Sequence, residues 1–266
     1  MKKMTKMVRQ PNRSDFVLKA FLAIFIVGYT FFFLSPYIMP KVYNFDNVTN
    51  VGESVLLDNY ILTIDSWDYA KEDRAFELIL DIENLTLNKN PKIDMICREG
   101  DKVYRAEIYK DISDDKKVVR IKNVSRRWVE VIFTVTVDKK TINLYMNDKN
   151  VNTVAKLKDR SKKEYLIYAA ESQIKGMENI ISKIKENQLV TDKQMNEGYN
   201  KLEELQAKKE NGDQSAENKS LIESNISSIS TELENLKAKQ DESFLEIENY
   251  EAKIKANKKE LEKLKN

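Results

Sequence analysis

The sequence IESNISSISTELENLKAKQDESFLEIENYEAKIKANKKELEKL, residues 222–264, decides how the last part of this chain folds. Its apolar residues recur at alternating spacings of four and three, which is the heptad pattern of a coiled coil. The predicted seam is Ile222, Ile226, Ile229, Leu233, Leu236, Gln240, Ser243, Ile247, Tyr250, Ile254, Asn257, Leu261 and Leu264. We therefore expect one long helix that buries this seam against a partner helix.

A second, weaker seam precedes the first in the chain. It consists of Ala170, Ile174, Met177, Ile181, Ile184, Gln188, Thr191, Met195, Gly198, Leu202 and Leu205. The residues between the seams, ENGDQSAE at 210–217, contain Gly212, which suits a helix end, and Asp213 and Ser215, either of which can cap the next helix. Residues 155–266 are therefore predicted to form an antiparallel coiled-coil hairpin with its loop near 210–217.

The register of this hairpin follows from the position of the loop. With Gly212 at the apex, residues pair when their numbers add to 424. The predicted pairs are Leu202 with Ile222, Met195 with Ile229, Ile184 with Gln240, Met177 with Ile247, and Ile174 with Tyr250. A shift of a few residues would set Gln188 against Gln240 instead. Polar seam residues such as Gln188, Gln240, Ser243 and Asn257 can fix one register, but the sequence leaves the choice open.

Residues 48–154 have a different pattern, in which apolar and polar residues alternate. The alternation is clearest in FELILDIEN (76–84) and WVEVIFTVTV (128–137), which we expect to be the two central strands. Weaker candidate strands are Ser54–Leu57, Tyr60–Trp67, Lys92–Arg98, Lys102–Lys110, Lys117–Lys122 and Thr141–Met146. The sequence thus predicts an all-β sandwich of two antiparallel sheets.

This β-rich region opens with Val51-Gly52-Glu53-Ser54, then NYILTIDSW (59–67) and FELILDIENLT (76–86). The order resembles the start of the immunoglobulin-like, telokin-like domains that Gram-positive bacteria place outside a membrane anchor. The similarity covers residues 51–146. It implies a fold and a compartment, and it implies no activity, because the function of that family is mostly unknown.

Residues 20–39, AFLAIFIVGYTFFFLSPYIM, form an uncharged run of twenty residues. At about 1.5 Å per residue, such a helix spans about 30 Å, the thickness of a bilayer's hydrocarbon core. The residues before it are strongly basic, which predicts a cytoplasmic N-terminus. We expect a basic cytoplasmic tail at 1–15, an uncleaved transmembrane signal-anchor helix at 16–39 and a linker at 40–47. The prediction is a single-pass plasma-membrane protein with an extracytoplasmic C-terminus.

The composition excludes several kinds of site. The chain contains no histidine and one cysteine, Cys97, so Ser-His and Cys-His nucleophilic pairs, His metal ligands and an intrachain disulfide are absent. Beyond the first nineteen residues no basic stretch points to nucleic acid. We predict no catalytic, cofactor-binding or metal-binding residue, and no cofactor.

Several residues belong to patterns that also occur in functional sites, and for each of them we favour a purely structural role. Asp111, Asp114 and Asp115 could bind Ca²⁺, but they lack the glycine and the distal glutamate of the usual loop. The remaining candidates are Trp67 and Trp128 as ligand platforms, Arg126 and Arg127 as anion contacts, and Asn47, Asn84 and Asn123 as glycosylation acceptors.

The expected function is that of a non-enzymatic envelope protein, a scaffold or accessory subunit of a cell-surface, secretion or conjugation machine. Its expected partners are membrane lipid through one span, and a protein or a second copy through the coiled coil. An alternative is an extracytoplasmic ligand sensor or receptor subunit. A third is a component similar to the membrane-fusion adaptors of export pumps.

Overall fold

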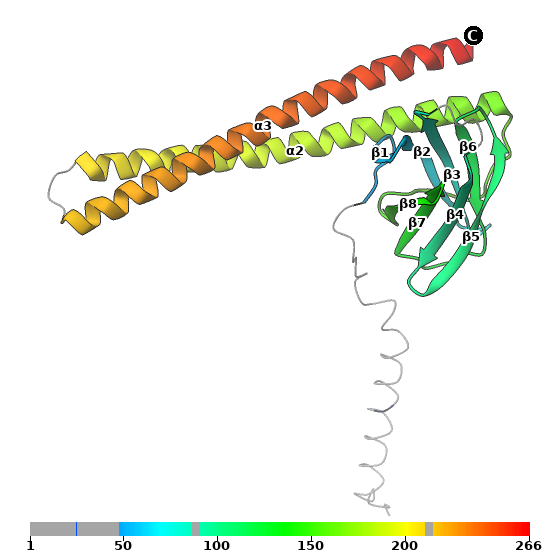
Figure 1. Cartoon of the computed structure of the whole chain (residues 1–266), viewed down its shortest axis with the longest axis horizontal. Helices are drawn as coiled ribbons and strands as arrows, with labels where there is room; N and C mark the ends of the chain where they lie inside the picture. Colours follow the sequence, from blue (N-terminus) through cyan, green and yellow to red (C-terminus); the bar gives the residue numbers. More distant parts are fainter. Residues whose placement is uncertain (1–24, 26–47, 87–90, 211–214) are drawn as a thin grey trace, which may run out of the picture. The chain divides into compact units, whose positions relative to one another are not determined.

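A computed structural model describes residue 25 and residues 48–86, 91–210 and 215–266. Apart from Phe25, these residues lie in one compact unit, 44–266. The unit contains a β-domain followed by two long helices (Figure 1). Its elements are β1 (Ser54–Leu57), β2 (Tyr60–Ala70), β3 (Ala75–Asn84), β4 (Ile93–Glu99), β5 (Lys102–Asp111), β6 (Lys116–Ile121), β7 (Glu130–Val137), β8 (Lys140–Asn147), β9 (Asn152–Val154), α2 (Lys162–Glu210) and α3 (Ala216–Lys265).

The strands of the β-domain form one sheet in the order β1-β2-β3-β6-β5-β4-β7-β8. All these neighbours are antiparallel, and the short β9 adds to β2 in parallel. The two ends of the sheet approach each other where the backbone N–H of Thr49 donates to the carbonyl of Tyr145, at 2.8 Å. The sheet is therefore a nearly closed barrel.

The predicted sandwich of two separate sheets is wrong. The first part of β5 pairs with β4 and its last part pairs with β6, so one long strand joins the two halves into a single sheet. Alternation of apolar and polar residues reports which face of a strand is buried, and it does not report which strand is the neighbour. The two strands with the clearest alternation do lie inside the sheet, as β3 and β7.

The interior of the barrel is filled by aromatic and aliphatic side chains. Trp67 packs edge-on against Phe76 and Phe133, with ring centroids 6.0 and 5.8 Å apart. Trp128 packs in the same way against Phe76, at 4.8 Å. Cys97 is fully buried in this core, where burial raises the pKa of its thiol to about 12. Both tryptophans and the cysteine are therefore core residues, and for the tryptophans this confirms the favoured structural role.

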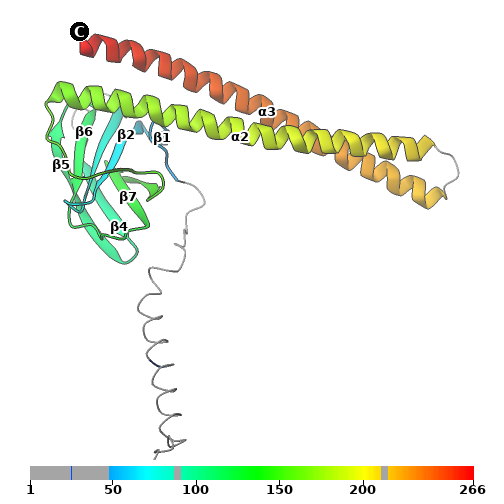
Figure 2. The same ribbon diagram turned by 180° about the vertical axis from the view of Figure 1, so that it is seen from behind.

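Helices α2 and α3 form the hairpin that the two seams predicted, and we call the pair the arm (Figures 1 and 2). The first helix ends at Glu210 and the second begins at Ala216. Ser215 caps the second helix, because its side chain accepts from the backbone N–H of Asn218 at 3.3 Å. Gly212 and Asp213 lie outside the described residues.

The register of the arm differs from the predicted one. Gln173 pairs with Asn257, Asp192 pairs with Gln240, and Gly198 faces Leu233. The residue numbers of these pairs add to 430, 432 and 431, whereas the predicted sum was 424. The predicted pairs are therefore wrong by about one heptad. A shift of seven residues leaves the same apolar positions facing each other, so the seam pattern does not select between the two.

The predicted transmembrane helix at 16–39, the tail at 1–15 and the linker at 40–47 lie outside the described residues, except for Phe25. Within the described part, neither the two long helices nor any other helical residue provides a stretch apolar enough to cross a membrane. The predictions of a single-pass membrane architecture and of a plasma-membrane location with an extracytoplasmic C-terminus are accordingly withdrawn.

Candidate functional site: the arm and its junction with the β-domain

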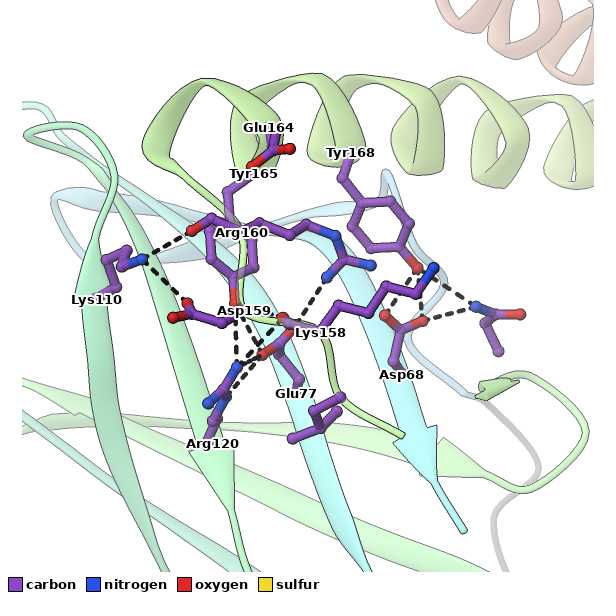
Figure 3. A network of polar contacts seen from close by, with 12 residues as sticks. Asp68, Glu77, Lys110, Arg120, Lys158, Asp159, Arg160, Glu164, Tyr165 and Tyr168 are labelled. Carbon is purple, nitrogen blue, oxygen red and sulfur yellow. Dashed lines mark hydrogen bonds and ion pairs between the residues drawn. The ribbon is translucent and has the colours of Figure 1, made fainter. Parts of the chain in front are cut away.

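The arm is fastened to the β-domain through a buried carboxylate, Glu77 of β3. The strand alternates, so Phe76 and Leu78 point into the barrel while Glu77 and Ile79 point outward, under the first turns of α2. Glu77 is 2% exposed and accepts from Arg120 Nε at 2.7 Å, Arg160 Nη1 at 3.1 Å and Tyr165 Oη at 3.1 Å (Figure 3). This outward face of the sheet is therefore an internal interface.

A second carboxylate, Asp68 of β2, holds the next turn of α2. It accepts from Tyr168 Oη at 2.7 Å and from the Asn152 side chain at 2.7 Å (Figure 3). Burial raises the pKa of Asp68, while these two hydrogen bonds partly offset the increase. Burial and the neighbouring carboxylate raise the pKa of Tyr168 to about 12, so the phenol stays a hydrogen-bond donor at neutral pH.

A third carboxylate, Asp65, begins a chain of polar contacts that runs from the sheet to α3. Asp65 is the extra residue of a bulge in the β2–β3 pairing and is 0% exposed. It accepts from Lys116 Nζ at 2.5 Å, and Lys116 also binds Asp81 at 2.5 Å. Gln173 of α2 donates to Asp65 and accepts from Asn257 of α3 at 2.7 Å. We call this set the register relay, because it ties the seam residue Asn257 to the β-domain.

The register relay predicts a pH-dependent stability. Burial, partly offset by Lys116, raises the pKa of Asp65 from 3.8 to about 6. The folded state thus binds this proton more tightly than the unfolded state, so the stabilising contribution is complete below pH 3.8 and is lost as the pH rises through about 6. The change is about 3 kcal/mol, at about 1.4 kcal/mol per pKa unit.

The measurement is urea unfolding of the full chain and of Asp65→Asn from about pH 4 to about pH 8. The stability of the variant relative to wild type is expected to rise across this range, because the variant carries no titrating group at the bulge. Parallel pH curves for the two proteins would show that Asp65 titrates alike in the folded and unfolded states.

The sequence reasoning did not single out these junction residues. One signal was present: Ile79 interrupts the charged face of β3, between Glu77 and Asp81. That isoleucine is 0% exposed, in a cluster with Ile112, Val118, Tyr165 and Ala169. A buried apolar residue among charges marks a face that another element covers. The charges at the junction satisfy one another, which is the arrangement of a structural interface.

The residues considered as calcium, anion or glycosylation sites do not come together in the structure. Asp111 pairs with Lys117 at 2.8 Å, and Asp114 and Asp115 are exposed in the turn before β6. Within the described residues no three Cys, Asp or Glu side chains are grouped as metal ligands. Of the remaining candidates, Arg126 and Arg127 are exposed before β7, Asn84 ends β3, Asn123 follows β6, and Asn47 lies outside the described residues.

The arm beyond the junction exposes large apolar side chains. Leu189 is 70% exposed, Tyr199 49% and Phe244 56%. Three exposed carboxylates lie among them, and the six residues together are named the acidic-aromatic strip. Its members are Leu189, Asp192 and Tyr199 of α2 and Asp241, Phe244 and Glu248 of α3.

The members of this strip share one side of the arm. Glu178 pairs with Lys258 and Glu171 with Lys265, at 3.4 and 2.7 Å, on the side where the two helices flank each other. Residues seven apart in a coiled coil share a face. Asp192 follows Glu178 by two heptads, Tyr199 follows it by three, and Phe244 precedes Lys258 by two heptads. Leu189, Asp241 and Glu248 then lie on the same side by the three- and four-residue spacing.

The two helices also meet at the same height along the arm. Gln240 donates to Asp192, and Phe244 lies one turn beyond Gln240. The helices are antiparallel, so a position one turn after Gln240 on α3 faces a position one turn before Asp192 on α2. That position on α2 is next to Leu189. Leu189 and Phe244 therefore lie at about the same height on one side of the arm, contributed by different helices.

A separate hollow of about 260 Å³ lies at Gly198. Leu233 of the facing helix packs against Gly198, so that a Cβ atom there would stand 2.8 Å from Leu233 Cδ2. The hollow is lined by Gln194, Glu197, Gly198, Lys201, Ile229, Glu232, Leu233 and Leu236. The buried Nε2 atom of Gln188, also on the seam, has no hydrogen-bond partner among the described residues. The hollow and the unpartnered Gln188 atom both lie in the part of the arm that carries the strip.

Comparison with known proteins identifies no relative: no family model, no curated protein and no solved structure matches this chain. The structure has a β-rich domain over the residues that carry the sequence resemblance, and a helical hairpin after it.

Proposed function

We propose that this chain is a non-enzymatic interaction scaffold, in which the β-domain serves as a base and the arm binds a protein partner. The observation that carries the proposal is the acidic-aromatic strip, where both helices expose large apolar side chains at one height. A two-helix arm has no need of exposed Leu189 and Phe244 for its own seam. Exposed apolar clusters of this kind typically mark binding surfaces.

The junction supports the same proposal. Three buried carboxylates hold α2 to the sheet, and the register relay extends this hold to α3. An arm fixed at its base presents its surface in a defined direction, which lowers the entropic cost of binding. The filled barrel interior, by contrast, favours a supporting role for the β-domain over that of a ligand sensor.

Site-specific photo-crosslinking of the full chain in its native cells tests the proposal. A photoreactive phenylalanine analogue at position 244 is expected to give a discrete protein adduct, because this position lies in the strip. The same analogue at Val103, which is 61% exposed on β5, serves as the control and is expected to give none. An adduct at position 103 with none at position 244 would assign binding to the β-domain instead.

A further inference from the structure

We infer that the acidic-aromatic strip docks a basic amphipathic helix of a partner protein. The inference rests on the proposed function and adds the chemistry of the partner. It follows from the charges that surround the exposed apolar side chains, and from their spacing along the arm.

The charges come mainly from α3. Residues 241–251, DESFLEIENYE, contain five carboxylates and no cation. All five carboxylate residues are exposed, and within the described part of the chain none forms an ion pair. Phe244 and Leu245 stand among them, 56% and 68% exposed. By the three-, four- and seven-residue spacings, Asp241, Glu248 and Glu251 share the side of Phe244. Two exposed lysines, Lys185 and Lys237, lie on this side as well, one heptad before Asp192 and Phe244. Carboxylates outnumber lysines around the apolar side chains, and this excess favours a partner that combines apolar side chains with lysine or arginine.

The same charges disfavour other partners. Nucleic acid and anionic lipid carry negative charge, so both would be repelled by this part of α3. A second copy of the chain would set one row of carboxylates against another if the strips met face to face. A cationic protein segment is the occupant that removes the repulsion.

The spacing of the apolar side chains indicates that the segment is helical. Leu189 and Tyr199 are ten residues apart on one side of α2, which corresponds to about 15 Å along the helix axis. A partner helix that presents apolar residues at positions i, i+3 or i+4, i+7 and i+11 covers about the same length. Its basic residues would then flank the apolar stripe and face Asp241, Glu248 and Asp192.

The first test uses a designed probe and the full chain. The probe is a labelled amphipathic peptide with leucine on its apolar stripe and lysine elsewhere, and the control peptide carries glutamate in place of every lysine. We expect the lysine peptide to bind, with an affinity that falls as salt is added, and the glutamate peptide not to bind. Equal binding of the two peptides would overturn the inference, because charge would then play no part.

Matched variants place the binding on the strip. Phe244→Ser is expected to weaken binding of the lysine peptide by about tenfold or more. Leu221→Ser is the control, because Leu221 is 61% exposed on α3 but lies on another side and more than five turns before Asp241, at about 3.6 residues per turn. Both positions are exposed, so circular dichroism should show the same helix content as wild type. An equal loss, or no loss, in the two variants would contradict docking at the strip.

Light scattering of the chain alone separates this inference from the proposed function. A monomer is expected. A dimer that Phe244→Ser converts to a monomer would assign the strip to a second copy and overturn the inference, while the arm would remain the interaction surface. An adduct at position 244 in cells without binding of the lysine peptide would likewise overturn only the partner chemistry. If the photoreactive analogue at position 244 gave no protein adduct in cells, the proposed function would be contradicted.

Discussion

Replacing Gly176 by alanine is expected to lower the free energy of unfolding by about 3 kcal/mol. Gly176 lies in α2 where the helix passes the segment before β1. A Cβ atom at this position would stand 2.2 Å from the carbonyl oxygen of Val51 and 2.8 Å from its carbonyl carbon. Both are backbone atoms, so relief of the clash requires moving either the helix or the start of the sheet.

The Val51 segment is poorly able to move. The next residue, Gly52, has a φ of +85° and its N–H donates to the carbonyl of Ile64 at 2.8 Å. A glycine inside a helix costs about 1 kcal/mol relative to alanine. The close approach of helix and segment explains why glycine stands there despite that cost.

Gly198→Ala is the matched control for this prediction. A Cβ atom at Gly198 would come within 2.8 Å of Leu233 Cδ2, which is the free end of a flexible side chain. Rotation of Leu233 relieves this contact, and alanine gains helix propensity, so the change in stability is expected to stay within about 1 kcal/mol. Urea unfolding of both variants makes the comparison. Equal destabilisation by the two substitutions would show that the junction is not tightly packed at Gly176.

Replacing Glu77 by alanine is expected to cost about 3–5 kcal/mol, the second large effect. The carboxylate is the common acceptor for Arg120, Arg160 and Tyr165. Without it, two guanidinium groups remain close together, at 14% and 18% side-chain exposure, with no counter-charge at this point. The loss should release the first turns of α2 from the sheet.

An exposed ion pair of the same domain provides the control. Glu72 pairs with Lys156 at 3.4 Å, with side-chain exposures of 59% and 67%. Glu72→Ala is expected to change the free energy of unfolding by less than about 1 kcal/mol. Hydrogen exchange of the α2 amides near Tyr165 should rise in Glu77→Ala and stay unchanged in Glu72→Ala. Similar exchange in both variants would argue against the role of Glu77 in holding the helix.

Much of the arm was accessible from the sequence, because helix formation and seam position depend on residues close together in the chain. The heptads predicted both helices, and the turn residues predicted the loop and a cap at Asp213 or Ser215, of which the structure uses Ser215. The strip was not foreseen, although Phe244 and Leu245 are readable as apolar residues off the seam. The strip can be located only when the register of the two helices is known, since Leu189 and Phe244 come from different helices.

The sequence by itself determined the two long helices, their short connection, and the faces of β3 and β7 that fill the core. Only the tertiary structure decided how the sheet closes through β5, which charged strand face is covered by α2, and which of two heptad registers the arm adopts. Alternation and heptads are local periodic patterns, and they look the same after a strand changes neighbour or a helix shifts by seven residues. Contacts between distant residues, such as Asp65 with Gln173 and Gln173 with Asn257, remove that degeneracy.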